Sequence, residues 1–154
     1  METEPKQHVH LSDAAAEHDV VARAEKDLDQ GKSASTAAGE FVREEIEHVR
    51  EGKHGARSAK QAIAIGLSKA RRAGIKLPPP PRTAKASTRR SAAAATRAAK
   101  RHARPSAKRS RAMLRKLKRE PKNTVSTKAL SRQAKSAARR RRSTGRTRAA
   151  SARS

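Results

Sequence analysis

The sequence predicts a mostly α-helical protein: a small helical hairpin or three-helix head at about residues 12–77, followed by a largely disordered, helix-prone basic tail. Three observations predict this class. Apolar residues before Pro78 recur with the spacing of an α-helix. Large apolar side chains are scarce, and Phe41 is the only aromatic residue, so the chain can bury only one small core. Beyond the prolines, residues 82–154 consist almost entirely of Ala, Arg, Lys, Ser and Thr.

We expect residues 1–11 to be disordered, because they are polar and lack an apolar pattern. A first helix is predicted from Ser12 or Asp13 to about Asp29, with Gly31 after its end. A second helix is predicted from about Thr36 to Glu51, with Gly52 as the residue that ends it. Its apolar stripe consists of Ala38, Phe41, Val42, Ile46 and Val49.

The third helix, in the stretch SAKQAIAIGLSKARRAGIKL at 58–77, carries the clearest local signals. Ser58 and Gln61 have the spacing of a capping box, in which the Gln61 side chain reaches back to the Ser58 N–H. Gly74 is placed to end the helix, with Ile75 folding back on Ala70. The predicted core face of this helix consists of Ile63, Leu67 and Ala70, packed against the second helix in an αα-hairpin.

The run of four prolines at 78–81 predicts an extended polyproline hinge between the head and the tail. Residues 82–154 then form a low-complexity basic tail with too little apolar surface to order itself. Two islands within it, 112–120 and 125–142, have helical patterns. Ser126 is the expected cap of the second island.

The charge of the chain is high and unevenly distributed. The formal net charge is +25, from 39 Lys and Arg residues against 14 Asp and Glu residues. Residues 1–51 hold 6 basic and 13 acidic side chains, whereas residues 78–154 hold 26 basic side chains and a single acidic one, Glu120. An acidic head joined to a polycationic tail indicates a polyanionic partner.

Several function classes are disfavoured by the residues present. There is no cysteine and no apolar run of transmembrane length, so we expect an intracellular protein with no membrane partner. His8, His10, His48 and His54 offer imidazoles, but no carboxylate set at a recognisable spacing completes a metal site. No nucleophile–base arrangement and no phosphate-binding glycine loop is present. The sequence therefore predicts no enzyme activity, no cofactor and no metal.

The segment HGARSAKQAIAIGLSKARRAGIK, at 54–76, resembles the signature of an uncharacterised bacterial family of unknown function. In that signature, a helix of the pattern KQAIAI-x-LS-x-ARRAG lies beside a tail rich in Lys, Arg and Ala. The tail of this chain is also similar in composition to linker histones and to bacterial histone-like proteins. The resemblance implies a DNA-binding role for the tail, although the acidic residues 1–51 depart from a histone-like pattern.

The sequence thus favours a sequence-independent nucleic-acid-binding protein, histone-like and nucleoid-associated, that acts by neutralising phosphates. The tail lacks the aromatic side chains that stack on single-stranded bases, which disfavours single-strand readout. DNA is the favoured partner over RNA, although composition does not separate the two. The alternatives are a head that binds a protein partner or itself while the tail localises it, and an RNA- or ribosome-associated protein. The candidate phosphate-binding residues are Lys53, Arg57, Lys60, Lys69, Arg71, Arg72, Arg89, Arg90, Lys100, Arg101, Lys108, Arg109, Lys116, Lys118, Arg119, Arg139, Arg140, Arg141 and Arg142.

Overall fold

The computed structural model describes the backbone of residues 8–151 and the side chains of residues 17–143. The described residues form helices and loops without a strand, which confirms the mostly α-helical fold class. The helices are α1 (His8–Asp29), α2 (Ala34–Arg50), α3 (Ala59–Arg72), α4 (Ala86–Lys100), α5 (Ala107–Lys118) and α6 (Thr127–Ser151).

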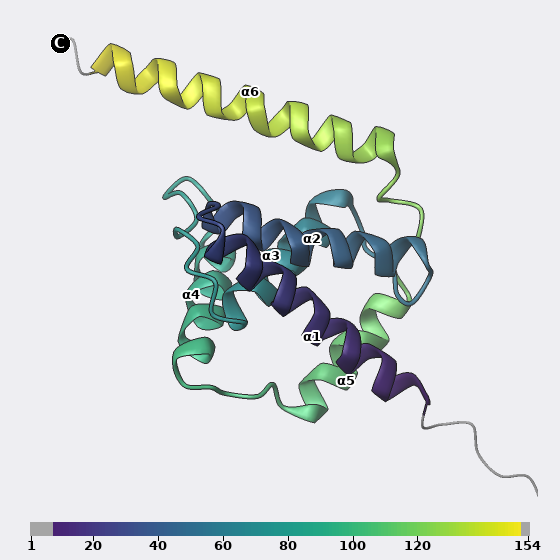
Figure 1. Cartoon of the computed structure of the whole chain (residues 1–154). Helices are drawn as coiled ribbons and strands as arrows, with labels where there is room; N and C mark the ends of the chain where they lie inside the picture. The colour runs from purple at the N-terminus through teal and green to yellow at the C-terminus, as the bar shows by residue number, and fades with distance from the viewer. Residues whose placement is uncertain (1–7, 152–154) are drawn as a thin grey trace, which may run out of the picture.

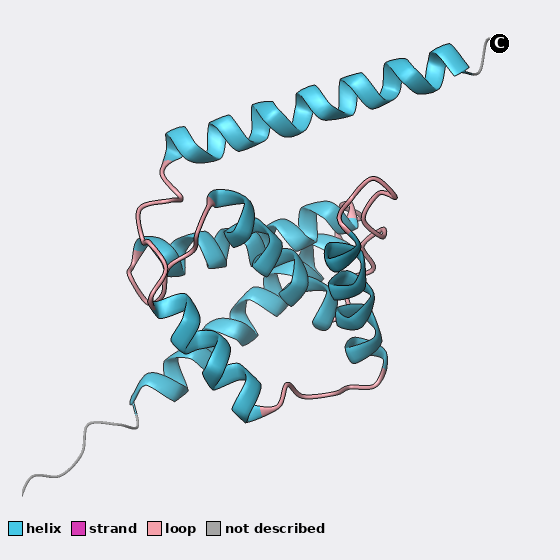
Figure 2. Cartoon of the chain, turned by 180° about the vertical axis from the view of Figure 1, so that it is seen from behind, coloured by secondary structure: helices cyan, strands magenta, loops and turns pink. Residues whose placement is uncertain are grey.

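Helices α1 to α4 make a bundle in which each helix packs on the next: α1 on α2, α2 on α3, and α3 on α4 (Figure 1). Helix α5 lies at one end of the bundle, after a long loop from α4 (Figure 2). Helix α6 contacts α3 and extends along one side of the bundle as a separate rod (Figures 1 and 2). The helical part of the chain is therefore larger than the predicted hairpin or three-helix head.

Two small apolar clusters make up the core. The first joins α1, α2, α3 and the residues after α3, and its buried members are Val20, Ala24, Ala37, Ala38, Phe41, Ala70 and Ile75. The second joins the end of α2, the loop before α3, α3 itself and the chain after α5 through Val49, Ala56, Ala62 and Val125. Most of these side chains are alanines, so the helices approach closely and each residue buries little apolar area.

The predicted helix ends are confirmed for the first three helices. Each ends with a left-handed glycine, at Gly31, Gly52 and Gly74, with φ of 74°, 76° and 98° respectively. After α3, the Ile75 N–H donates to the Ala70 carbonyl at 3.1 Å, as its position predicts. At the other end of α3, the Gln61 N–H donates to the Ser58 hydroxyl at 3.2 Å. The Gln61 side chain differs from the prediction, because it accepts from the Arg57 N–H at 2.6 Å instead of the Ser58 N–H.

The buried face of α3 is rotated from the one that the sequence predicts. Its buried residues are Ala59, Ala62, Gly66 and Ala70, whereas Ile63 and Leu67 are half-buried at the flanks. The cause is the close approach of α2. A Cβ on Gly66 would lie 2.6 Å from the Cα of Val42. Only small residues fit on that line of contact, so the larger side chains of Ile63 and Leu67 lie beside it, where Leu67 still packs against the first apolar cluster.

The tail also differs from the expectation of disorder, since α4, α5 and α6 all fall within residues 82–154. Alanine, arginine and lysine are strong helix formers, and the buried Ala92 and Ala95 give α4 a face to place on α3. Residues 8–11, predicted as disordered, belong to α1. Residues 1–7 and 152–154 lie outside the described residues. The proline run at 78–81 has no regular secondary structure.

A segment of the predicted tail is built into the head. The Gly55 N–H donates to the Leu117 carbonyl at 2.8 Å, and the Ala56 N–H donates to the Pro121 carbonyl at 2.9 Å. The Thr124 hydroxyl donates to the Ala56 carbonyl at 2.7 Å. These bonds hold residues 117–125, which we call the docking segment, against the loop between α2 and α3. The predicted head and the predicted tail are therefore in contact, although the proline run at 78–81 separates them in the sequence.

Replacing Val125 with alanine is expected to destabilise the bundle. Val125 is 1% exposed and packs with Val49, Ala56 and Ala62, so the change removes two buried methyl groups and leaves a cavity. We expect a loss of about 2 kcal/mol in the free energy of unfolding, measured by urea denaturation with circular dichroism. An exposed neighbour, Ser131→Ala, serves as the control. No change for Val125→Ala would show that the docking segment does not contribute to the core.

Candidate nucleic-acid interface

The structure distributes the predicted phosphate-binding residues over several surfaces instead of gathering them at one point. They are spread over α3 and the loop before it, α4, α5 and α6, including the residues that directly follow α4 and α5. Seventeen of them are exposed: Lys53, Arg57, Lys60, Arg72, Arg89, Arg90, Lys100, Arg101, Lys108, Arg109, Lys116, Lys118, Arg119, Arg139, Arg140, Arg141 and Arg142. Such an arrangement suits neutralisation of an extended polyanion better than recognition of a single phosphate.

Two of the predicted residues, Lys69 and Arg71, are half-buried and have partners within the protein. The Lys69 ammonium lies 3.0 Å from Oε2 of the fully buried Glu45, so its charge is already compensated. The Arg71 guanidinium donates to the Pro78 carbonyl at 3.0 Å, where it ties the end of α3 to the proline run. Burial lowers the pKa of Arg71, although an arginine stays charged in any case. Neither side chain is well placed to bind phosphate.

Helix α6 carries a cationic stripe that the sequence analysis missed. We define it as Lys128, Arg132, Lys135, Arg139 and Arg142, which are all exposed and alternate in spacing between four and three residues. Residues with this spacing lie on one face of a helix. At a rise of 1.5 Å per residue, the stripe is about 21 Å long. The regular spacing is present in the sequence, but it marks one face only if 127–151 is a continuous helix, which the arginine run at 139–142 does not by itself indicate.

An open groove lies beside the beginning of the stripe. It is bounded by the first turn of α3 on one side and by the start of α6 on the other, and it is lined by Ser58, Ala59, Lys60, Asn123, Thr124, Ser126, Ala129, Arg132, Gln133 and Ser136. Lys60 and Arg132 bring two cations to its edges, and hydroxyl and amide groups line the rest. The groove therefore extends the basic surface of α6 onto the bundle.

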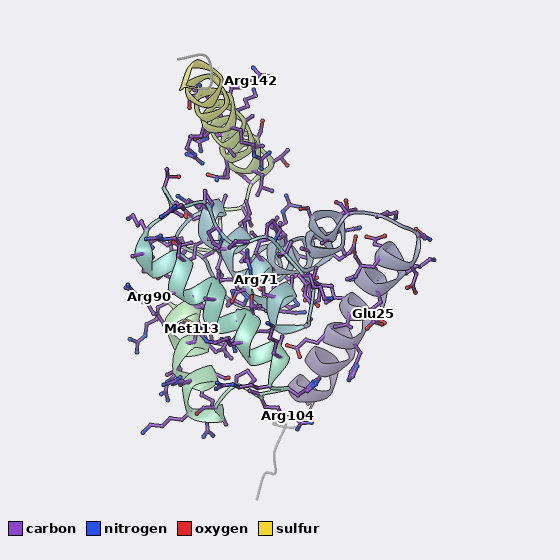
Figure 3. All side chains as sticks on the ribbon, turned by 90° about the vertical axis from the view of Figure 1, so that its left-hand side faces the viewer. Glu25, Arg71, Arg90, Arg104, Met113 and Arg142 are labelled. Carbon is purple, nitrogen blue, oxygen red and sulfur yellow. The ribbon has the colours of Figure 1, made fainter. Side chains whose placement is uncertain are left out.

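Acidic and basic surfaces are separated in space. Figure 3 shows Glu25 on α1 and Arg90 on α4 at opposite sides of the bundle, with Arg142 on α6 apart from both. Several carboxylates in residues 17–51 form ion pairs with basic side chains of the same part of the chain. Glu40 pairs with Arg23 at 2.9 Å, Asp27 pairs with Lys32 at 2.6 Å, and Glu47 pairs with Arg43 at 3.3 Å. The acidic surface of α1 thus lies away from the cations of α4.

A polar cluster is buried under the contact between α2 and α3. Glu45 is 0% exposed and Glu44 is 6% exposed, and His54 lies beside them at 7%. Burial raises the pKa of Glu44, and the neighbouring Lys69 partly offsets this effect. Burial lowers the pKa of His48, and the charges of Lys69 and Lys53 lower it further. These buried polar side chains differ from the alanine-rich contacts elsewhere between the helices. Phosphate binding does not explain why they are buried.

None of the described helices is long and apolar enough to cross a membrane. No curated protein and no solved structure matches the chain. One protein-family model does match, over residues 29–81, which run from the end of α1 through α2 and α3 to the last proline of the run. This part of the chain is therefore similar to a family of unknown function (DUF6496), which agrees with the expectation of an uncharacterised family at this helix.

Proposed function

We propose that this protein is a non-enzymatic, sequence-independent nucleic-acid-binding protein that neutralises phosphates, with duplex DNA as its favoured partner. The observation that carries the proposal is the cationic stripe of α6 on a helix that extends from the bundle. Its length of about 21 Å equals about six base pairs of duplex at 3.4 Å each. Cations along a straight rod can each displace a counterion without any base contact.

The other exposed cations support the same function. Arg89, Arg90 and Lys100 lie on α4, and Lys108 and Arg109 lie on α5, so more than one helix presents positive charge. A chain with several separate basic surfaces can contact more than one duplex at once. We therefore propose that it bundles or compacts DNA and acts at the nucleoid.

The salt dependence of binding tests this proposal. For the full chain, fluorescence anisotropy with a labelled duplex should give a linear fall of log Kobs against log salt, with a slope near −0.9 for each phosphate neutralised. Replacing the five residues of the stripe with glutamine should make the slope shallower by up to about 4.5, and affinity at low salt should fall by at least about 100-fold. Scrambled duplexes of equal length should bind alike.

A matched variant separates the stripe from net charge alone. Five exposed cations of α5 and the residue after it can be replaced with glutamine instead: Lys108, Arg109, Lys116, Lys118 and Arg119. This change removes the same charge from a different surface, and we expect a clearly smaller loss. Equal losses of affinity in the two variants would mean that the stripe of α6 contributes no more to binding than the cations of α5 do. If the full chain binds neither duplex DNA nor RNA at low salt, the proposed function is wrong. If it binds RNA more tightly than DNA, the partner is RNA and not DNA.

A further inference from the structure

The buried polar cluster brings together ligand groups that lie on two different elements. Glu45 and His48 stand three residues apart on α2, so their side chains share one face of the helix. His54 comes from the loop after α2, which turns back at Gly52. One carboxylate oxygen and one ring nitrogen from each histidine lie within 4.8 Å of one another. The sequence pattern gave no carboxylate to complete a metal site with His48 and His54. The fold supplies one, Glu45.

Glu45 is the unusual member of this cluster. Its side chain is fully buried, and neither of its oxygens has a hydrogen-bond partner among the described residues. Lys69 Nζ lies 3.0 Å from Oε2, and His54 Nε2 lies 3.2 Å from Oε1, both within ion-pair distance but outside hydrogen-bond geometry. A buried carboxylate without hydrogen bonds is costly. A positively charged group beside Oε1 would offset part of that cost.

The ring of His54 is held in the orientation of a ligand. Its Nδ1 lies 3.1 Å from the Gly55 carbonyl, which can only accept, so Nδ1 carries the hydrogen. In the neutral form of such a ring, Nε2 has a lone pair, which here would face Glu45 Oε1 at 3.2 Å, and a cation bound between the two atoms would be shared by both. Metal-bound histidines commonly donate their second ring N–H to a backbone carbonyl in this way.

We propose that Glu45, His48 and His54 form a binding site for a divalent transition-metal ion, with Zn²⁺ as the favoured occupant. Two imidazoles and one carboxylate are a ligand set that zinc prefers, whereas magnesium prefers oxygen ligands and water. Zinc–ligand bonds of about 2.0–2.2 Å place two ligands of a tetrahedral ion about 3.3–3.6 Å apart. The 3.2 Å between Oε1 and Nε2 is close to the lower end of that range. His48, half-buried, supplies the third ligand by moving inward, and water completes the shell.

Lys69 sets a limit on the affinity. Its ammonium beside Oε2 fixes the carboxylate but also repels a second cation. We therefore expect weaker binding than that of the structural sites in zinc fingers. The ion would fasten the loop after α2, whose Gly55 and Ala56 hold the docking segment, so metal binding is expected to stabilise the packed bundle. This role is separate from phosphate binding by α6.

Calorimetric titration of the untagged, chelator-treated full chain with Zn²⁺ tests the site. We expect one ion at this site per chain, and no comparable binding of Mg²⁺. His48→Gln should weaken zinc binding by about 100-fold or more and abolish the zinc-dependent rise in the thermal midpoint. His48 is only half-buried, so this variant should fold, which its metal-free circular dichroism and melting curve will verify.

Control variants keep the other histidines from obscuring the result. His8 and His10 are two residues apart, and His18 on α1 and His102 after α4 are exposed. A chain with His8, His10, His18 and His102 replaced with glutamine should keep the zinc affinity and the thermal shift of the original. If this fourfold variant loses binding, if His48→Gln binds as the original does, or if the original chain binds no zinc, the proposed site is wrong.

Discussion

Replacing Gly66 with alanine is expected to destabilise the protein by about 3 kcal/mol or more, because the new methyl group meets backbone atoms that cannot turn aside. A Cβ at this position would lie 2.6 Å from the Cα of Val42 and 2.9 Å from the carbonyl oxygen of Phe41. Helices α2 and α3 would have to separate. That separation would loosen both apolar clusters, since each contains residues of both helices.

Gly39 provides a matched control for this prediction. It also lies inside a helix, α2, but a Cβ there meets nothing within 4 Å. Gly39→Ala should therefore raise the free energy of unfolding by about 0.5–1 kcal/mol, because alanine is the better helix former. Urea denaturation of both variants, followed by far-ultraviolet circular dichroism, measures the difference. Equal stability of the two variants would mean that α2 and α3 do not cross at Gly66.

Local signals in the sequence predict the helix ends well. Ser58, Gly52 and Gly74 act through hydrogen bonds to residues at most five positions away, so their roles follow from spacing alone. The face of α3 does not follow in the same way. Ile63 and Leu67 satisfy the helical period, but so do Ala62, Gly66 and Ala70. Which stripe is buried depends on how near α2 comes, and that distance is a property of the packed pair.

The cluster around Glu45 could not be predicted either, because it also depends on how α2 and α3 pack. The pair His48 and His54 is visible in the sequence, whereas Glu45 is one of several acidic residues on α2 that a pattern assigns to solvent. Only the fold shows that α3 covers this side of α2 and that Lys69 compensates part of the charge. The charge of the tail, in contrast, could be predicted from composition, and the stripe of α6 follows from it once the helix is known.

Contacts between residues far apart in the chain were the least predictable part. Val125 packs on Val49 and Ala56, about seventy residues earlier, and composition gives no sign of it. The docking segment resembles the rest of the basic tail in its residues. It is distinguished by Pro121 and Val125, and by a small residue opposite, Gly55, that admits its backbone.

Replacing Gly55 with alanine should therefore detach the docking segment. A Cβ on Gly55 would overlap the Glu120 carbonyl and lie 2.7 Å from the Pro121 carbonyl oxygen, so the two backbones could not stay together. The variant loses the bonds from the Gly55 and Ala56 N–H groups and uncovers Val125. Gly55 does not have a positive φ, so the expected cost of about 3 kcal/mol comes from the overlap and the lost contacts, not from backbone strain.

Limited proteolysis makes this detachment visible. Trypsin can cleave after Lys122, an exposed residue in the docking segment. If cleavage follows the population of the open segment, a cost of about 3 kcal/mol accelerates it by about 100-fold, whereas Gly39→Ala should leave the rate unchanged. Because α6 follows this segment, the same variant should let α6 move away from α3, which would open the groove between the two helices. Unchanged cleavage after Lys122 in Gly55→Ala would mean that the loop and the segment do not pack together, and that α6 is tethered only through the chain.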